Sequence, residues 1–178
     1  MLAPVSLEMR GSSVALMLLL VLLAPARSPG QERLEQLGRW RDRPARCLRS
    51  WAGARLSPCT SVVLDQRTAG VMRLLLLAPA PAPVAYTQLG FVGQLQSGSE
   101  PMPCRQGLCR FSKPMVLSLS SVSQAEFDAR GLALGLPSAW PVNGQCLLRP
   151  ERIRCEARAF SGESWTAEAV GAEPMKRD

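Results

Sequence analysis

Six cysteines constrain this chain more than any other feature. They are even in number, and none lies in the first 46 residues. In an exported protein such a set is interpreted as a disulfide framework, which supports a domain by closing short loops of chain. The interpretation therefore depends on the compartment. The six positions are Cys47, Cys59, Cys104, Cys109, Cys146 and Cys155.

The N-terminus has the plan of a secretory signal peptide. Arg10 precedes an apolar run over 14–24, and small residues follow it up to Ala26. The run is much shorter than the roughly 20 apolar residues that a membrane-spanning helix needs. We therefore predict cleavage after Ala26, with translation starting at Met1 or Met9. The predicted location is secreted or periplasmic, with no transmembrane anchor after cleavage.

Local geometry favours one disulfide in the last third of the chain. Pro150 suits the second position of a four-residue turn between Arg149 and Arg152. Strands folded about this turn bring Cys146 opposite Cys155 as a non-hydrogen-bonded pair, with Cα atoms roughly 4.5 Å apart. A disulfide spans that distance.

A second hairpin follows from the turn residues Gln106-Gly107, because glycine tolerates the positive φ that tight turns require. It brings Cys104 opposite Cys109, which leaves Cys47 to pair with Cys59. In the chain-entropy model the three closed loops together contribute about 8 kcal/mol of stability. We predict no free thiol in the oxidised mature protein.

The remaining pattern predicts an α+β fold: an antiparallel sheet of about five to six strands, with short N-terminal helices and one short internal helix, held by disulfides. Apolar residues at three-residue spacing and cap residues predict the helices, whereas β-branched, continuous apolar or alternating runs predict the strands. The expected helices cover 31–41, 42–53 and 123–131. The expected strands cover 61–64, 71–77, 89–95 and 111–119, followed by the 146–155 hairpin.

The chain divides into three predicted parts: a signal peptide over 1–26, a single disulfide-bonded domain over 27–160, and a disordered tail over 161–178. The Ala-Pro repeats of 78–83 are interpreted as a stiff connection at a sheet edge, with an interdomain linker as the alternative.

Histidine is absent, which excludes Ser-His and Cys-His nucleophilic sites and His-ligated metals. No Ser-x-x-Lys spacing and no phosphate-binding glycine loop occurs. Three acids in the predicted ordered part, Asp65, Glu126 and Asp128, leave a carboxylate-dependent hydrolase as the less favoured option. We expect no enzymatic activity, no cofactor and no metal.

The strongest positive signal is a basic N-terminal segment. The sequence from Arg27 to Arg55 contains eight arginines and three acids, in a chain of net charge +7. Tryptophans between the arginines suit an anionic lipid surface or an acidic glycan, whereas export argues against nucleic acid. An unknown protein partner stays open. The candidate contact residues are Arg33, Arg39, Trp40, Arg41, Arg43, Arg46, Arg49, Trp51 and Arg55. The alternative is a solvated helix face with both tryptophans in the core.

A second hypothesis concerns Arg105, which lies inside the predicted disulfide-closed loop. A basic residue on a preorganised loop is typical of protease inhibitors, because rigidity lowers the entropy cost of binding. The loop has no inhibitor family motif, and a purely structural hairpin is the alternative.

The stretch GLALGLPSAWPVNGQC, residues 131–146, together with the Cys104 and Cys109 turn, resembles small exported uncharacterised proteins of marine cyanobacteria. The resemblance covers about half of the mature chain. It implies a periplasmic, luminal or secreted location and carries over no activity.

Overall fold

A computed structural model describes residues 37–52, 54–68 and 70–171. Within these residues the protein is all-β: twelve strands form a single sheet, and there is no helix. The predicted α+β class is therefore wrong. The predicted signal peptide and Arg33 lie outside the described residues. No helix in the described part is long and apolar enough to cross a membrane.

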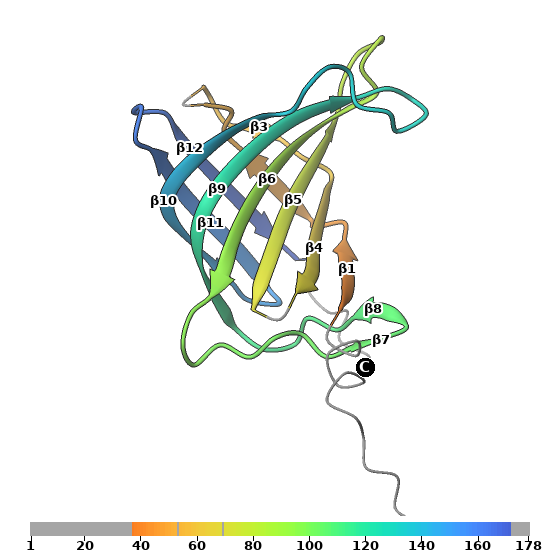
Figure 1. Ribbon diagram of the computed structural model, residues 1–178. Helices are drawn as coiled ribbons and strands as arrows, with labels where there is room; N and C mark the ends of the chain where they lie inside the picture. The colour runs from red at the N-terminus through yellow and green to blue at the C-terminus, as the bar shows by residue number, and fades with distance from the viewer. Residues whose placement is uncertain (1–36, 53, 69, 172–178) are drawn as a thin grey trace, which may run out of the picture.

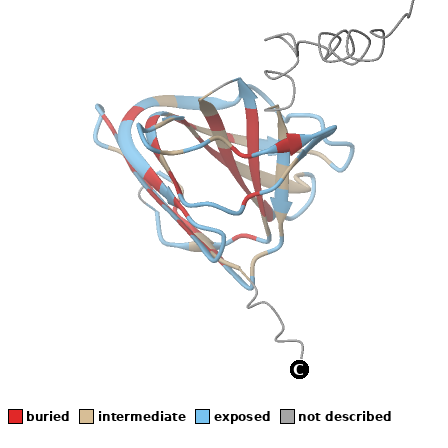
Figure 2. Ribbon diagram, turned by 90° about the horizontal axis from the view of Figure 1, so that it is seen from below, coloured by how far each residue is buried: buried red, intermediate tan, exposed pale blue. Residues whose placement is uncertain are grey.

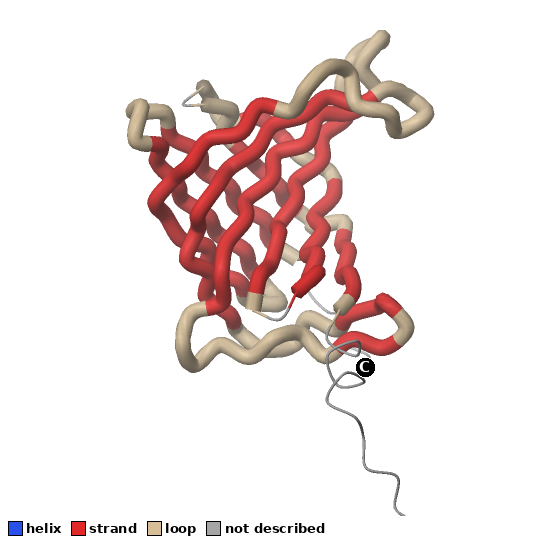
Figure 3. The backbone as a smooth tube through the Cα atoms, in the orientation of Figure 1, coloured by secondary structure: helices blue, strands red, loops and turns tan. Residues whose placement is uncertain are grey.

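Seven strands form an antiparallel meander, in which each strand pairs with the one before it and the one after it. They are β4 (Ser61–Thr68), β5 (Val71–Pro79), β6 (Tyr86–Leu95), β9 (Met115–Phe127), β10 (Ser138–Leu148), β11 (Arg152–Ala159) and β12 (Ser164–Val170). Figures 1 and 3 show that these strands curl into a barrel-shaped wall.

The segment before the meander closes the wall. β1 (Gly38–Asp42) pairs with β4 at one edge, and β2 (Arg46–Arg49) pairs with β12 at the other edge. Because only three residues separate β1 from β2, both edges of the meander come together at one stretch of chain. Short strands extend beyond it: β3 (Ser57–Pro58) beside β2, and the hairpin of β7 (Cys104–Arg105) and β8 (Gly107–Cys109) beside β1.

The core fills the inside of this wall. Along β11 every second residue is buried, while the residues between them are exposed. This is the period of two expected of a strand with one face on the core. Figure 2, which views the molecule from below, shows the same alternation of buried and exposed residues along the wall strands. The largest fully buried side chains include Trp165, Phe91, Leu64 and Met72.

The predicted N-terminal helices are wrong where the structure describes them, because 38–42 and 46–49 are strands. In β1 the side chain of Trp40 packs on the core, and the arginines on either side are more exposed. In β2 Cys47 and Arg49 are buried. The residues up to Trp40 therefore fit both the three-residue spacing of a helix and the two-residue alternation of a strand. Pairing with distant strands makes this segment a strand.

The predicted internal helix over 123–131 is also wrong, since β9 continues to Phe127. Residues 123–126 have the spacing of a helix cap. In the structure all four pair with β6, and Ser123 and Gln124 also pair with β10. Asp128 forms the turn that follows: its Oδ1 accepts hydrogen bonds from the backbone N–H groups of Arg130 and Leu132, both at 2.9 Å.

All three predicted disulfides are confirmed, and no described cysteine is free. Cys146 pairs with Cys155 in the predicted register, with a Cα–Cα distance of 4.1 Å. The backbones of Arg149 and Arg152 exchange hydrogen bonds of 2.9 and 3.0 Å next to the turn. The other two bridges, Cys47–Cys59 and Cys104–Cys109, have Cα–Cα distances of 4.9 and 3.9 Å.

The predicted disordered tail is wrong over 164–170, which form β12. Trp165 is fully buried there and lies 5.0 Å from the ring of Trp140. By contrast, the strands expected over 61–64, 71–77 and 89–95 are present, in longer form, as β4, β5 and β6. The Ala-Pro repeats end β5 and then connect it to β6, its direct partner in the sheet.

Gly144 allows β10 to approach β11 closely, next to an irregularity in the pairing of β10 with β9. A Cβ atom on Gly144 would lie 2.2 Å from the carbonyl oxygen of Glu156 and 2.7 Å from the Cα of Ala157. Both are backbone atoms of a paired strand, so Gly144→Ala should lower the free energy of unfolding by about 2–3 kcal/mol in urea denaturation. Gly98→Ala is the control, because its φ is +87° but its Cβ would meet open space, and it should cost about 1 kcal/mol. Equal losses would contradict this explanation.

Candidate anion-binding surface

The predicted basic segment does not form one surface, because its residues point in different directions. Arg39 and Arg41 of β1 flank Trp40, which packs inward with its ring 5.3 Å from that of Phe111. By alternation along the strand, both arginines lie on the outer face of the barrel wall.

The other predicted contact residues lie elsewhere. Arg43 and Arg55 are exposed in connections. Arg46 pairs with Glu168 of β12 at 3.1 Å. Trp51 is partly buried, with its ring 5.5 Å from the guanidinium carbon of Arg49.

Arg49 is a buried cation inside the barrel. Only 3% of its surface is exposed, and its Nη1 donates to the carbonyl oxygen of Leu76 at 3.1 Å. Its Nη2 donates to the hydroxyl of Thr87 on β6. Burial lowers the pKa of Arg49 to about 10, so the group stays charged at neutral pH. Arg49 therefore links β2 to β5 and β6 by hydrogen bonds inside the barrel. It is unavailable to an external ligand.

Five directly paired residues instead form a row across five strands. Arg73 of β5 pairs with Asp65 of β4, Asp65 with Arg39 of β1, Arg39 with Leu108 of β8, and Leu108 with Arg105 of β7. Paired residues on neighbouring strands share a face of the sheet. At about 4.8 Å between strands, the row is about 19 Å long.

Two further arginines extend this row along the strands. Arg41 lies two residues from Arg39 and so shares its face, and Arg67, at a bulge of β4, reaches Asp65 with its Nε at 2.9 Å. We call Arg39, Arg41, Arg67, Arg73 and Arg105 the arginine patch. Three of its guanidinium groups, those of Arg39, Arg67 and Arg73, contact the carboxylate of Asp65.

Asp65 organises the centre of the patch. Its Oδ2 accepts hydrogen bonds from Arg67 Nε at 2.9 Å and Arg73 Nη2 at 3.0 Å, and it lies 3.4 Å from Arg39 Nη2. The Asp65 side chain is only 6% exposed, whereas the three arginine side chains are 36–67% exposed. One buried carboxylate thus holds three partly exposed cations, and their remaining N–H groups can bind an external anion.

Burial opposes the ionisation of Asp65, but hydrogen bonds from Arg67 and Arg73 and the charges of Arg67 and Arg39 lower its pKa overall. The group is therefore ionised at neutral pH and unsuited to act as a general acid there. Asp65 holds arginines in place and does not form part of a carboxylate pair.

The lowered pKa makes stability depend on pH. The unfolded chain binds a proton at Asp65 more readily than the folded protein, so this contribution is present above about pH 4 and is lost as pH falls further. At pH 7, Asp65→Asn should lower the free energy of unfolding by about 1–2 kcal/mol. Urea denaturation at pH 7 and at about pH 2 checks this, because the difference from the parent protein should become smaller in acid. A difference that is constant with pH would contradict it.

Arg67 and Arg73 were missed by sequence reasoning, although a signal for Arg67 existed. The predicted hairpin placed 65–70 in a turn, whereas β4 continues to Thr68. A longer strand would have placed Arg67 two residues from Asp65, but pairing Asp65 with Arg73 also depends on the bulge between Gln66 and Thr68, which the sequence pattern did not indicate.

The other residues proposed from sequence are placed as follows. Arg105 is exposed next to the tight turn at Gln106 and Gly107, whose φ values are 52° and 79°. The inhibitor hypothesis for this loop stays a prediction.

Among the described residues no three Cys, Asp or Glu side chains gather as metal ligands. The side chain of Asp128 accepts backbone hydrogen bonds in the turn after β9, as described above.

Comparisons with known proteins assign no family: neither a family model, nor a curated protein, nor a solved structure matches the chain.

Proposed function

We propose that the protein is a non-enzymatic binding module that uses the arginine patch to hold a linear polyanion, with an acidic polysaccharide as the ligand class. The observation that carries the proposal is the row of residues across β5, β4, β1, β8 and β7, with arginines at both ends and at its centre. The three disulfides indicate an oxidising, extracytoplasmic environment, where such polymers occur.

The shape of the patch favours a polymer over a small anion. Its charges are spread over about 19 Å of an outer wall, so a ligand with repeated charges can contact several arginines at once. Guanidinium groups bind sulfate and carboxylate through paired hydrogen bonds. Leu108, which is 76% exposed within the row, offers apolar surface between the charges.

The test is binding of the oxidised protein to heparin, a sulfated polysaccharide, at low and high salt. Arg41→Gln with Arg105→Gln removes two patch charges that have no partner at Asp65, so the carboxylate keeps its arginines. Two exposed contacts of about 0.2–1 kcal/mol each predict a two- to thirtyfold rise in Kd. High salt should weaken binding by the parent protein.

The matched control is Arg149→Gln with Arg158→Gln, which removes the same charge from exposed positions at the β10–β11 turn and on β11. Its Kd should stay close to that of the parent protein. Equal weakening in both double variants would show that net charge alone drives binding, and would overturn the proposed site. Binding to phosphatidylglycerol vesicles but not to heparin would overturn the ligand class.

A further inference from the structure

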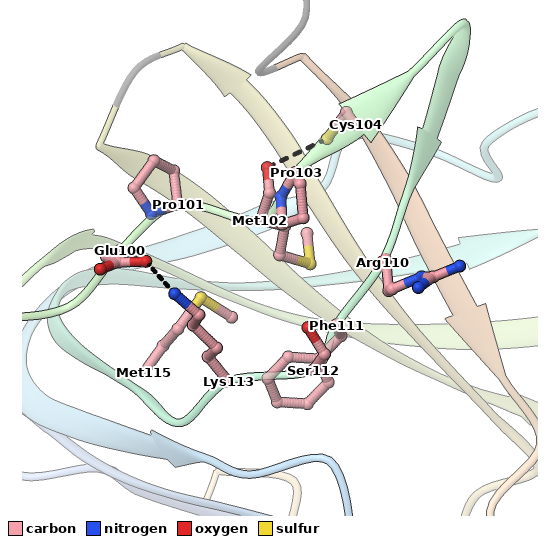
Figure 4. Close-up of a pocket in the computed structure, with 10 residues that line it drawn as sticks. All are labelled: Glu100, Pro101, Met102, Pro103, Cys104, Arg110, Phe111, Ser112, Lys113 and Met115. Atoms are coloured by element: carbon pink, nitrogen blue, oxygen red, sulfur yellow. Dashed lines mark hydrogen bonds and ion pairs between the residues drawn. The ribbon is translucent and has the colours of Figure 1, made fainter.

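The long connection between β6 and β9, at the lower end of the barrel in Figure 1, borders an open cavity of about 590 Å³. Two arms of the connection form its rims, residues 100–104 and residues 110–115 (Figure 4). This volume lies within the range of small-molecule sites in proteins, about 300–1,000 Å³.

The two arms are fastened to each other at both ends. At one end Lys113 Nζ lies 2.5 Å from a carboxylate oxygen of Glu100. At the other end the backbone N–H of Arg110 donates to the carbonyl oxygen of Pro103 at 2.9 Å, beside the Cys104–Cys109 disulfide. The disulfide end of the opening is therefore held by the fold, whereas the other end is held only by an exposed ion pair.

The cavity has apolar walls that are themselves part of the core. Met102 and Met115 are each 2% exposed, and Phe111 is 7% exposed. The side chain of Gln66 fixes the backbone of Met102 by hydrogen bonds of 3.0 and 3.3 Å. Figure 4 shows Met102, Met115 and Phe111 directed into the space between the arms. These buried side chains form the floor of the cavity, and the more exposed Pro101 and Pro103 form its apolar rim.

Charged side chains lie at both ends of this space, with Arg110 at one end and an ion pair at the other. Glu100 and Lys113 face each other at the latter end, and their side chains are 68% and 67% exposed. An exposed ion pair has little net stability, so an incoming anion can replace Glu100 as the partner of Lys113 at small cost.

We propose that this cavity binds a small molecule with an apolar body and one carboxylate or sulfonate group. The apolar body contacts Pro101, Pro103 and the accessible edge of Phe111, above the buried Met102 and Met115. The anionic group takes the place of Glu100 at Lys113. This site is separate from the arginine patch and does not depend on the proposed function.

The probe for the test is the dye 8-anilino-1-naphthalenesulfonate, with N-phenyl-1-naphthylamine as an uncharged analogue of similar shape. The oxidised protein should bind the sulfonate dye at one saturable site, and decanoate should displace it. Lys113→Gln should weaken the sulfonate dye about three- to tenfold, whereas Glu100→Gln should strengthen it by a similar factor, since Lys113 is then free. Neither substitution should change binding of the uncharged dye by more than about twofold.

Ser112→Trp places a large ring at the exposed rim of the cavity, outside the core, and should abolish binding of both dyes. The patch variant Arg41→Gln with Arg105→Gln is the control, and its dye binding should be unchanged. Absence of saturable binding would overturn the proposal. So would binding that Ser112→Trp leaves intact, because the dye would then occupy another surface, such as the exposed Leu136 and Phe160. Equal effects of Lys113→Gln on both dyes would overturn the anionic ligand class.

Discussion

Reduction of all three disulfides is expected to unfold the protein. The bridges close short loops, with sequence separations of 5, 9 and 12, and the chain-entropy model assigns them about 8 kcal/mol together. A domain of this size has a typical total stability of about 5–15 kcal/mol. The reduced chain should therefore be largely unfolded, or unfold at a far lower urea concentration than the oxidised protein, by far-ultraviolet circular dichroism.

The single bridge of the β7–β8 hairpin provides the control. Replacing both Cys104 and Cys109 by alanine should cost about 2 kcal/mol and leave the spectrum of the remaining sheet native, because this hairpin lies at the end of the strand order. A reduced protein with the urea midpoint of the oxidised one would contradict the stabilising role of the bridges.

Trp165→Ala is the single substitution with the largest expected effect. Trp165 has no exposed surface, and its ring lies 5.0 Å from that of Trp140 inside the barrel. Truncating a buried tryptophan removes its apolar contacts and leaves a cavity, which typically costs about 3–5 kcal/mol. Urea denaturation monitored by circular dichroism measures the loss.

Trp165→Phe separates packing from hydrogen bonding. The indole Nε1 has no hydrogen-bond partner among the described residues, so phenylalanine loses part of the volume and no bond. Its cost should be no more than about half that of alanine. A loss below about 1 kcal/mol for alanine would contradict the placement of β12 in the core.

Local turn chemistry accounts for what the sequence predicted well. The hairpins that contain Cys146–Cys155 and Cys104–Cys109 each depend on a turn of two central residues and on alternation over a few pairs. Pro150 and Gly107 carry that information within ten residues of the bridges. Register then follows from the turn itself, so the pairings could be predicted without knowledge of the rest of the fold.

Non-local pairing accounts for what the sequence did not predict. Trp40 stands three residues after Leu37 and six after Leu34, which is a helical spacing, yet 38–42 pair with β4 and 46–49 pair with β12. These contacts join segments far apart in the chain, and strand propensity depends on such neighbours more than on the local sequence. The same limit applied to the site, because Asp65 and Arg39 meet only through β1–β4 pairing.

The proposed binding site can be tested most directly by titrating the oxidised, isotope-labelled protein with a short heparin oligosaccharide and following amide chemical shifts in solution. We predict saturable shifts concentrated in β5, β4, β1, β8 and β7, around Arg73, Asp65, Arg39 and Arg105. Shifts concentrated instead on β11 and β12, around Arg152 and Glu168, or no shifts at all at low salt, would contradict it.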